Sequence, residues 1–313
     1  MRFALRCVAA LPLLFPLPAQ AQGIFSSGAP RMTGEFWAYK PASLAPYKAP
    51  NKAHWKLSEI LAAHRGQNDW VQPLVRNQDQ EADYIAMSSG SKTKARFYGN
   101  DRIVFIVQEG VIRVTIDGTE PFTATKGFMV NVPARHVYTL ETTSSTPSLR
   151  FEVRPAGAHA LYPLSETPNR VAGGTYVKVR GTPGPAKDPD RNPIFLDFQK
   201  QADEGKFKTG AIFVRDDHFT ANIIRGKGVP VPPDSEKGHF HVDVNEFWFI
   251  MEGKLGYKIE GLPYFEADQG DVVTAVAGRW HRALNSPNAE MSTRIPINPR
   301  PPILHNFEPG AAE

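Results

Sequence analysis

Two histidines two residues apart, with a carboxylate five residues after the second, form the stretch of this chain that could bind a metal. Residues 238–253 read GHFHVDVNEFWFIMEG and include His239, His241 and Glu246. The β-branched and aromatic residues around them favour strands, in which alternate side chains share a face. His239 and His241 therefore point the same way. Imidazoles beside a carboxylate are typical ligands of divalent metals.

A fourth candidate ligand, His281, lies in a second stretch downstream. Residues 270–285 read GDVVTAVAGRWHRALN, in which a turn at Ala277-Gly278 precedes the histidine. A strand after this turn could bring His281 back over the first pair. Three imidazoles and one carboxylate suit one divalent transition metal, namely manganese, iron, cobalt, nickel, copper or zinc. The ligands alone do not choose among these metals.

The two stretches resemble the two sequence motifs of the cupin superfamily. The first motif is Gly, five residues, His-x-His, three or four residues, Glu, six residues, Gly. The second is Gly, five residues, Pro-x-Gly, two residues, His, three residues, Asn. The matching residues are His239, His241, Glu246 and Gly253 in the first motif and Gly270, Gly278, His281 and Asn285 in the second. Pro233 replaces the opening glycine and Val276 replaces the proline, so the departures affect turns and not ligands.

An internal duplication is indicated by two pairs of markers at one offset. Glu109-Gly110 aligns with Glu252-Gly253 (253 − 110 = 143), and Gly127 aligns with Gly270 (270 − 127 = 143). The offset maps the four ligands onto Arg96, Tyr98, Ile103 and Tyr138, so none of the four is retained. We therefore predict a two-cupin protein with a degenerate first cupin and a metal-binding second cupin.

The rest of the chain supports an all-β fold class. Short apolar runs separated by Gly, Asp and Asn turns favour strands, and the resemblance implies tandem antiparallel jelly-roll barrels. One or two short helices are expected as well, the first over 53–64 with Asn51 as a cap. The expected divisions are a signal peptide (1–21), an N-terminal arm with the short helix (22–80), the degenerate cupin (81–170), a linker (171–193), the metal-binding cupin (194–300) and a tail (301–313). We expect the arm to dock through its aromatic residues Phe36, Trp37 and Tyr39.

The first residues predict export. Arg2 and Arg6 precede an apolar segment, and Ala19-Gln20-Ala21 ends it in an A-x-A pattern, so we expect cleavage after Ala21. The chain's one cysteine would be removed with this segment, which favours a periplasmic or secreted protein that needs no disulfide. The segment is too short and too rich in proline for a membrane anchor. The net charge of +4 comes with no basic patch, so nucleic acid is not an expected partner.

Strand alternation predicts the walls of a pocket beside the metal. The residues expected there are Trp248 and Ile250 on the face of Glu246, Tyr257 on the next strand, and Asn222 and Ile224 on an earlier strand. Such walls favour an aromatic or largely apolar small molecule over a sugar phosphate. Arg279 is expected near the ligands, where it could pair with a substrate carboxylate or with a surface acid. The remaining histidines His159, His218 and His305 have no ligand-like spacing and are expected to be structural.

The predicted site is compatible with three functions. The ligand set resembles that of quercetinase-like cupin dioxygenases, which implies a periplasmic mononuclear metal-dependent oxidoreductase acting on a small phenolic or enolisable compound. A non-redox decarboxylase, lyase or isomerase would use the same Lewis acid, as in oxalate decarboxylase-like two-cupin proteins. The third possible function is that of a non-catalytic protein that binds a metal or a small ligand. Glu246 either stays a ligand or detaches as a general base. Cupins often pair through sheet edges, which leaves a homo-oligomer open.

Overall fold

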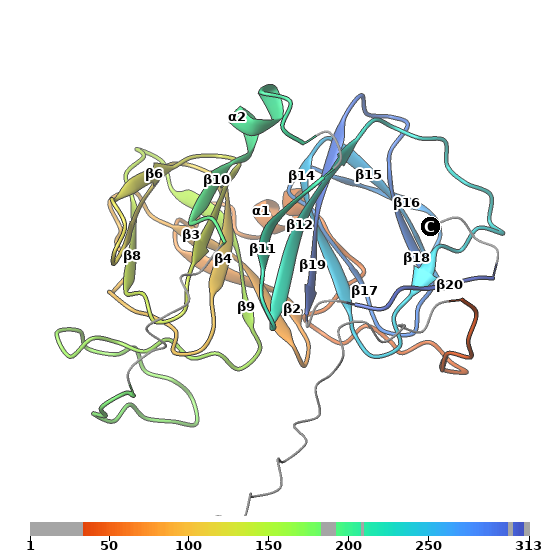
Figure 1. Ribbon diagram of the computed structural model, residues 1–313. Helices are drawn as coiled ribbons and strands as arrows, with labels where there is room; N and C mark the ends of the chain where they lie inside the picture. The colour runs from red at the N-terminus through yellow and green to blue at the C-terminus, as the bar shows by residue number, and fades with distance from the viewer. Residues whose placement is uncertain (1–33, 183–191, 208–209, 300–302, 310–313) are drawn as a thin grey trace, which may run out of the picture. The chain divides into compact units, whose positions relative to one another are not determined.

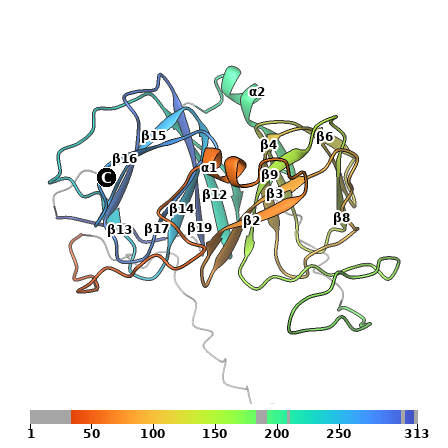
Figure 2. The ribbon, with the colours of Figure 1, turned by 180° about the vertical axis from the view of Figure 1, so that it is seen from behind.

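The computed structural model describes residues 34–182, 192–207, 210–299 and 303–309 (Figures 1 and 2). The predicted signal peptide (1–21) and the middle of the predicted linker (183–191) lie outside these ranges. The chain divides into a unit Met1–Trp37 and a unit Ala38–Glu313, and the second carries every described helix and strand. In the described residues, no helix is long and apolar enough to span a membrane.

Antiparallel strands dominate the second unit, and its two helices, α1 (Leu57–Ala63) and α2 (Phe198–Asp203), are short. The first half contains a six-stranded sheet in the order β10 (Phe195–Asp197), β7 (Phe128–Val132), β4 (Ile103–Glu109), β9 (Ser148–Pro155), β3 (Gln80–Met87) and β2 (Trp70–Arg76). A three-stranded sheet, β6 (Phe122–Ala124), β5 (Ile112–Ile116) and β8 (Tyr138–Thr142), faces it.

The second half repeats this arrangement. Its six-stranded sheet runs β1 (His54–Trp55), β17 (Val272–Ala275), β14 (Glu246–Glu252), β19 (Ser292–Pro299), β12 (Phe219–Gly226) and β11 (Ala211–Arg215). Its five-stranded sheet runs β16 (Phe265–Asp268), β15 (Lys254–Ile259), β18 (His281–Asn285), β13 (His239–Phe240) and β20 (Asn306–Phe307). The predicted fold class, tandem antiparallel jelly-roll barrels with short helices, is confirmed.

The two six-stranded sheets share one hydrophobic core between the halves, because alternate residues of each strand face the opposite sheet. On β14, Phe247 and Phe249 enter this shared core, whereas Trp248 and Ile250 enter the interior of the second barrel. Across the interface the ring of Phe151 on β9 stacks on Phe249 at 4.9 Å. Each central strand is therefore covered on both faces, which explains its nearly continuous apolar sequence.

The N-terminal segment reaches the second barrel through polar contacts rather than through aromatic rings. The Lys40 ammonium donates to Glu260 and to the carbonyl oxygen of Gly278, and the Tyr47 hydroxyl donates to the carbonyl oxygen of Thr274. The side chain of Tyr39 is 72% exposed. The expected docking through Tyr39 is thus wrong, whereas Phe36 and Trp37 belong to the first unit, and their docking stays a prediction.

Helix α1 begins four residues later than the spacing predicted. His54 lies in the short strand β1, which pairs with β17, and its Nε2 atom is 2.7 Å from the Asp271 carboxylate. The same carboxylate accepts a hydrogen bond from the Leu57 backbone N–H, 2.9 Å away, at the start of the helix. Asn51 is not the cap, because its side chain pairs with the backbone of Arg76. A partner distant in sequence therefore sets where the helix begins.

Truncating Phe249 tests whether the shared core holds the halves together. Phe249→Ala removes a fully buried ring, so the free energy of unfolding should fall by about 3–5 kcal/mol. Val71→Ala, at a position 55% exposed, should change it by less than about 0.5 kcal/mol. Urea denaturation followed by circular dichroism measures both. Equal small effects would contradict a shared core.

Candidate metal centre

The four predicted ligands come together in the second barrel. His239 of β13 pairs with His281 of β18 across the sheet, and their Nε2 atoms are 3.1 Å apart. The Glu246 Oε2 atom, at the start of β14, lies 3.2 Å from the Nε2 atoms of both His241 and His281. It lies 3.7 Å from Nε2 of His239. All four ligand atoms fall within 4.8 Å of one another, a grouping that could hold a metal ion.

The outer nitrogens of two histidines are held by backbone carbonyls. Nδ1 of His241 lies 3.0 Å from the Leu304 carbonyl oxygen, and Nδ1 of His281 lies 2.9 Å from the Arg279 carbonyl oxygen. Each carbonyl only accepts, so each Nδ1 carries the proton and donates it. The inner Nε2 atoms then present lone pairs toward Glu246. Such contacts fix the ring orientation and tautomer of metal-ligating histidines.

The electrostatics of the cluster favour a cation at its centre. Burial alone would raise the pKa of Glu246, but the surrounding rings of His239, His241 and His281 outweigh this effect and hold the pKa well below the usual range. Burial lowers the pKa of His239, and the neighbouring imidazoles lower it further. The cluster therefore combines an ionised carboxylate with a ring kept neutral. Lone pairs facing an anion at about 3 Å repel unless a proton or metal lies between them, so these residues fit a metal.

A cavity of about 280 Å³ opens beside the cluster. It is lined by Ile224, Gly238, His239, Glu246, Trp248, Arg282, Ala283, Arg294, Pro296, His305 and Phe307. Two of its walls, Trp248 and Ile224, are residues expected in the pocket from strand alternation. The Trp248 ring meets the ring of His281 edge-on at 5.4 Å. A small molecule in this cavity would lie against Trp248 and next to Glu246.

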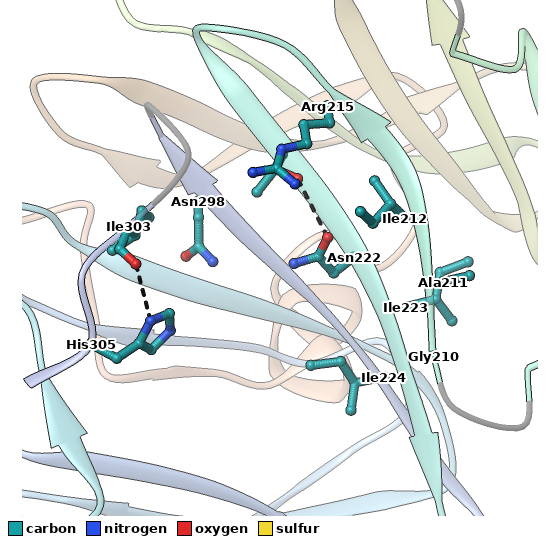
Figure 3. Close-up of a pocket in the computed structure, with 11 residues that line it drawn as sticks. Gly210, Ala211, Ile212, Arg215, Asn222, Ile223, Ile224, Asn298, Ile303 and His305 are labelled. Atoms are coloured by element: carbon teal, nitrogen blue, oxygen red, sulfur yellow. Dashed lines mark hydrogen bonds between the residues drawn. The ribbon is translucent and has the colours of Figure 1, made fainter. Parts of the chain in front are cut away.

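The other expected wall residues lie elsewhere, and Arg279 lies away from the cavity. Ile250 and Tyr257 belong to the fully buried core of the barrel, behind Trp248, because the cavity ends before it reaches them. Asn222 lines a neighbouring cavity of about 490 Å³ (Figure 3). The Arg279 guanidinium donates to the backbone carbonyls of Glu260 and Ala45, so it anchors the N-terminal segment.

Sequence spacing missed a histidine that the C-terminal segment brings to the site. The ring of His305 lies 4.7 Å from that of His239 and 4.9 Å from that of His241, centroid to centroid. It lines this cavity as well as the neighbouring one, where Figure 3 shows its ring. Strand β20, immediately after it, pairs with β13. Its distance in sequence from the other histidines left no local signal.

Sequence spacing also missed two arginines in the cavity wall. Arg294 on β19 and Arg282 on β18 both line the cavity. The guanidinium of Arg282 reaches a surface carboxylate, Glu236, at 2.6 Å. Arg294 lies between apolar neighbours on a strand that sequence alone would place in the core.

The first barrel has a different cluster at the matching place. Arg96 forms an isolated β-bridge with Tyr138, and its Nε donates to the Tyr138 hydroxyl at 2.9 Å. A shift of 143 residues takes this pair to His239 and His281 (96 + 143 = 239; 138 + 143 = 281), which form the bridge between β13 and β18. A guanidinium thus occupies the place that the metal ligands occupy in the second barrel.

Comparisons with known proteins indicate the fold. No family model matches the chain, and no curated protein matches its sequence at a significant level. A salicylate 1,2-dioxygenase from Pseudaminobacter salicylatoxidans is similar with a TM-score of 0.60 and 13% identity, covering 85% of this chain and 87% of that one. A cupin 2 conserved barrel domain protein from Leptotrichia buccalis has a TM-score of 0.51 and 10% identity over 79% and 95%. A variant of oxalate decarboxylase from Bacillus subtilis has a TM-score of 0.50 and 11% identity over 83% and 80%. The chain therefore has the cupin fold.

Removing two ligands tests the metal centre. We expect about one equivalent of a divalent transition metal per chain, and its loss in a His239→Ala/His281→Ala variant, because two of four ligand atoms disappear. Elemental analysis of the purified protein measures this content. His218→Ala, which removes an exposed histidine just before β12 that pairs with Asp101, is the matched control and should keep its metal. Metal retained by the double variant would contradict the assignment.

Acid stability tests the buried pair in the first barrel. Glu152 is buried beside Arg150, 2.8 Å away, and although burial would raise its pKa, the charges of Arg150 and Arg96 lower it overall. A lowered folded-state pKa contributes stability above the unfolded value, about 4.5, and this contribution is lost as the pH falls through the folded pKa. Glu152→Gln should therefore be less stable at pH 7.

The same variant should lose less stability than the wild type between pH 5 and pH 2. Urea denaturation across this range measures the free energy of unfolding at each pH. Glu120→Gln, at an exposed position, should follow the wild-type curve. Parallel curves for Glu152→Gln and the wild type would show that this carboxyl does not titrate on unfolding.

Proposed function

We propose that the chain is an exported mononuclear metal-dependent cupin enzyme, a dioxygenase acting on a small phenolic or enolisable compound. The convergence of His239, His241, Glu246 and His281 beside a small cavity is the observation that carries this proposal. Three imidazoles and one carboxylate form a ligand set suited to a first-row transition metal. Export to the periplasm is part of the proposal and rests on the A-x-A pattern that ends at Ala21.

The proposal includes one working site in an internally duplicated chain. The bridge of Arg96 with Tyr138 and the bridge of His239 with His281 are related by the same offset of 143 as the glycine markers. Arg96 beside Tyr138 cannot bind a divalent cation as a neutral imidazole does, because a guanidinium has no lone pair to offer. The first barrel then has a structural role through the core that it shares with the second.

The walls of the cavity suit a small, flat, largely apolar substrate. Trp248 offers an aromatic face, and Pro296, Ile224 and Phe307 add apolar surface. A volume of about 280 Å³ matches a single substituted ring rather than a large molecule. Among the solved structures of similar fold, the salicylate 1,2-dioxygenase has been seen in complex with gentisate. This similarity supports a phenolic substrate.

The chain's own residues would orient the substrate and control its protons. A bound metal would supply Lewis-acid polarisation of substrate oxygens and redox chemistry. The backbone carbonyls of Arg279 and Leu304 hold the rings of His281 and His241 with Nε2 turned inward. The Glu246 carboxylate, kept ionised, can accept a proton at Oε2 if it leaves the metal. Trp248 and Phe307 limit the access of water to this carboxylate.

Oxygen consumption tests the proposed activity. We expect the metal-loaded protein to consume dissolved oxygen with at least one member of a panel of phenols, hydroxybenzoates and flavonols. His241→Ala should reduce the rate at least a hundredfold because it removes a buried ligand, whereas His218→Ala should not change it. An oxygen electrode measures the rate. Turnover under nitrogen would instead indicate a decarboxylase, lyase or isomerase, and no turnover with bound metal would indicate a binding protein.

A further inference from the structure

One cation in the cavity wall has no counter-ion among the residues that the structure describes. Arg294 lies on β19, where it pairs with Ile250 of β14 on one side and with Ile224 of β12 on the other. Its neighbour Ile295 faces the core between the sheets, so the Arg294 side chain faces the barrel interior and lines the cavity beside Glu246. Among the described residues it makes no ion pair. Its hydrogen bond there goes to the Asn285 amide oxygen, at a long 3.4 Å.

The environment of Arg294 is costly for a charge. Burial lowers its pKa, against the opposing influence of Tyr257 and Glu246. Glu246 cannot serve as its partner in the working site, because its Oε2 atom lies among the three imidazoles. A partly buried guanidinium without a carboxylate destabilises the folded state unless a ligand supplies the missing charge. The cavity gives such a ligand access to Arg294.

The first barrel shows how the chain satisfies an arginine at the matching place. Arg150 on β9 pairs with Val107 of β4, as Arg294 pairs with Ile250, and these partners differ by the duplication offset (107 + 143 = 250). Arg150 donates from Nε to Glu152, two residues along the same strand, at 2.8 Å. Two residues after Arg294 stands Pro296, which has no charge. The internal counter-ion is present in the first barrel and absent in the second.

We propose that Arg294 is the anion-binding residue of the metal pocket and that the substrate carries a carboxylate on a small apolar body. The inference rests on the proposed function, in that it names the substrate class of the same site. The substrate's carboxylate lies beside Arg294 as the Glu152 carboxylate lies beside Arg150 in the first barrel. The body of the molecule then lies against Trp248, with Glu246 on the same wall of the cavity.

A carboxylate fits this place better than a phosphate. One guanidinium matches the two oxygens of a planar carboxylate in a bidentate pair. A phosphate carries more charge and would need further cations, but the other arginine of the cavity, Arg282, already pairs with Glu236. The apolar walls formed by Trp248, Pro296 and Phe307 also offer few donors to a phosphate.

The test compares two probes that differ only in charge, benzoate and benzamide. Binding to the purified full chain is measured by titration calorimetry, with and without bound metal, so that the metal's own attraction for a carboxylate is separated. The wild type should bind benzoate about tenfold to a hundredfold more tightly than benzamide in both forms, because a charge-assisted pair is gained. Arg294→Gln should abolish this preference.

Pro296→Glu provides a second variant that leaves Arg294 in place. It places a carboxylate two residues after Arg294, as Glu152 follows Arg150 in the first barrel. Benzoate and benzamide should then bind with about equal affinity. Pro296→Gln matches its size without the charge, and Arg282→Gln removes an arginine that is already paired, so both should keep the preference. Thermal unfolding of each variant checks that it is folded.

Three outcomes would overturn the inference. These are equal binding of the two probes by the wild type, no binding of either probe, or a preference that survives in both Arg294→Gln and Pro296→Glu. The binding assay needs no turnover and no metal. A chain that prefers benzoate through Arg294 but consumes no oxygen would refute the dioxygenase alone, and a chain that consumes oxygen without this preference would refute the inference alone.

Discussion

The structure depends on central strands that are buried on both faces. In β14 one set of side chains, Phe247 and Phe249, enters the core between the two six-stranded sheets, while Glu246 and Trp248 face the barrel interior. A shift of one residue would exchange these sets and move a carboxylate into the apolar core. The hydrophobic core between the halves therefore sets the register of β14, and with it the position of the candidate metal ligand Glu246.

The same constraint determines which charges the interior can hold. Both barrels carry an inward-facing arginine on the strand after the second motif region. The buried charge of this arginine is compensated differently in the two barrels. In the first barrel Arg150 is satisfied by Glu152, and the polar interior near Arg96 is closed by Tyr138. In the second barrel three imidazoles surround Glu246, while Arg294 faces the cavity. One barrel neutralises its interior charges, and the other leaves them for a metal and a ligand.

Most of the fold and the four residues that cluster as candidate metal ligands could be predicted from local sequence. The period of two in the strands, the turn residues and the His-x-His spacing all act between near neighbours in the chain. The predictions failed where a residue distant in sequence determines the local structure. Helix α1 begins at Leu57 because Asp271 accepts from its first N–H. The N-terminal segment is held by Lys40 and Tyr47, whose partners lie more than 200 residues away, while Tyr39 is exposed.

The sequence by itself determined that three imidazoles and one carboxylate share one barrel, because their spacing and strand alternation leave little freedom. It also determined that the first half lacks these ligands. Only the tertiary structure decided that His305 closes the site and that Arg294, rather than Arg279, faces the cavity. The reason is physical. The face of the sheet that an arginine occupies, and whether a carboxylate lies beside it, depend on how the sheets pack, and local sequence does not specify this packing.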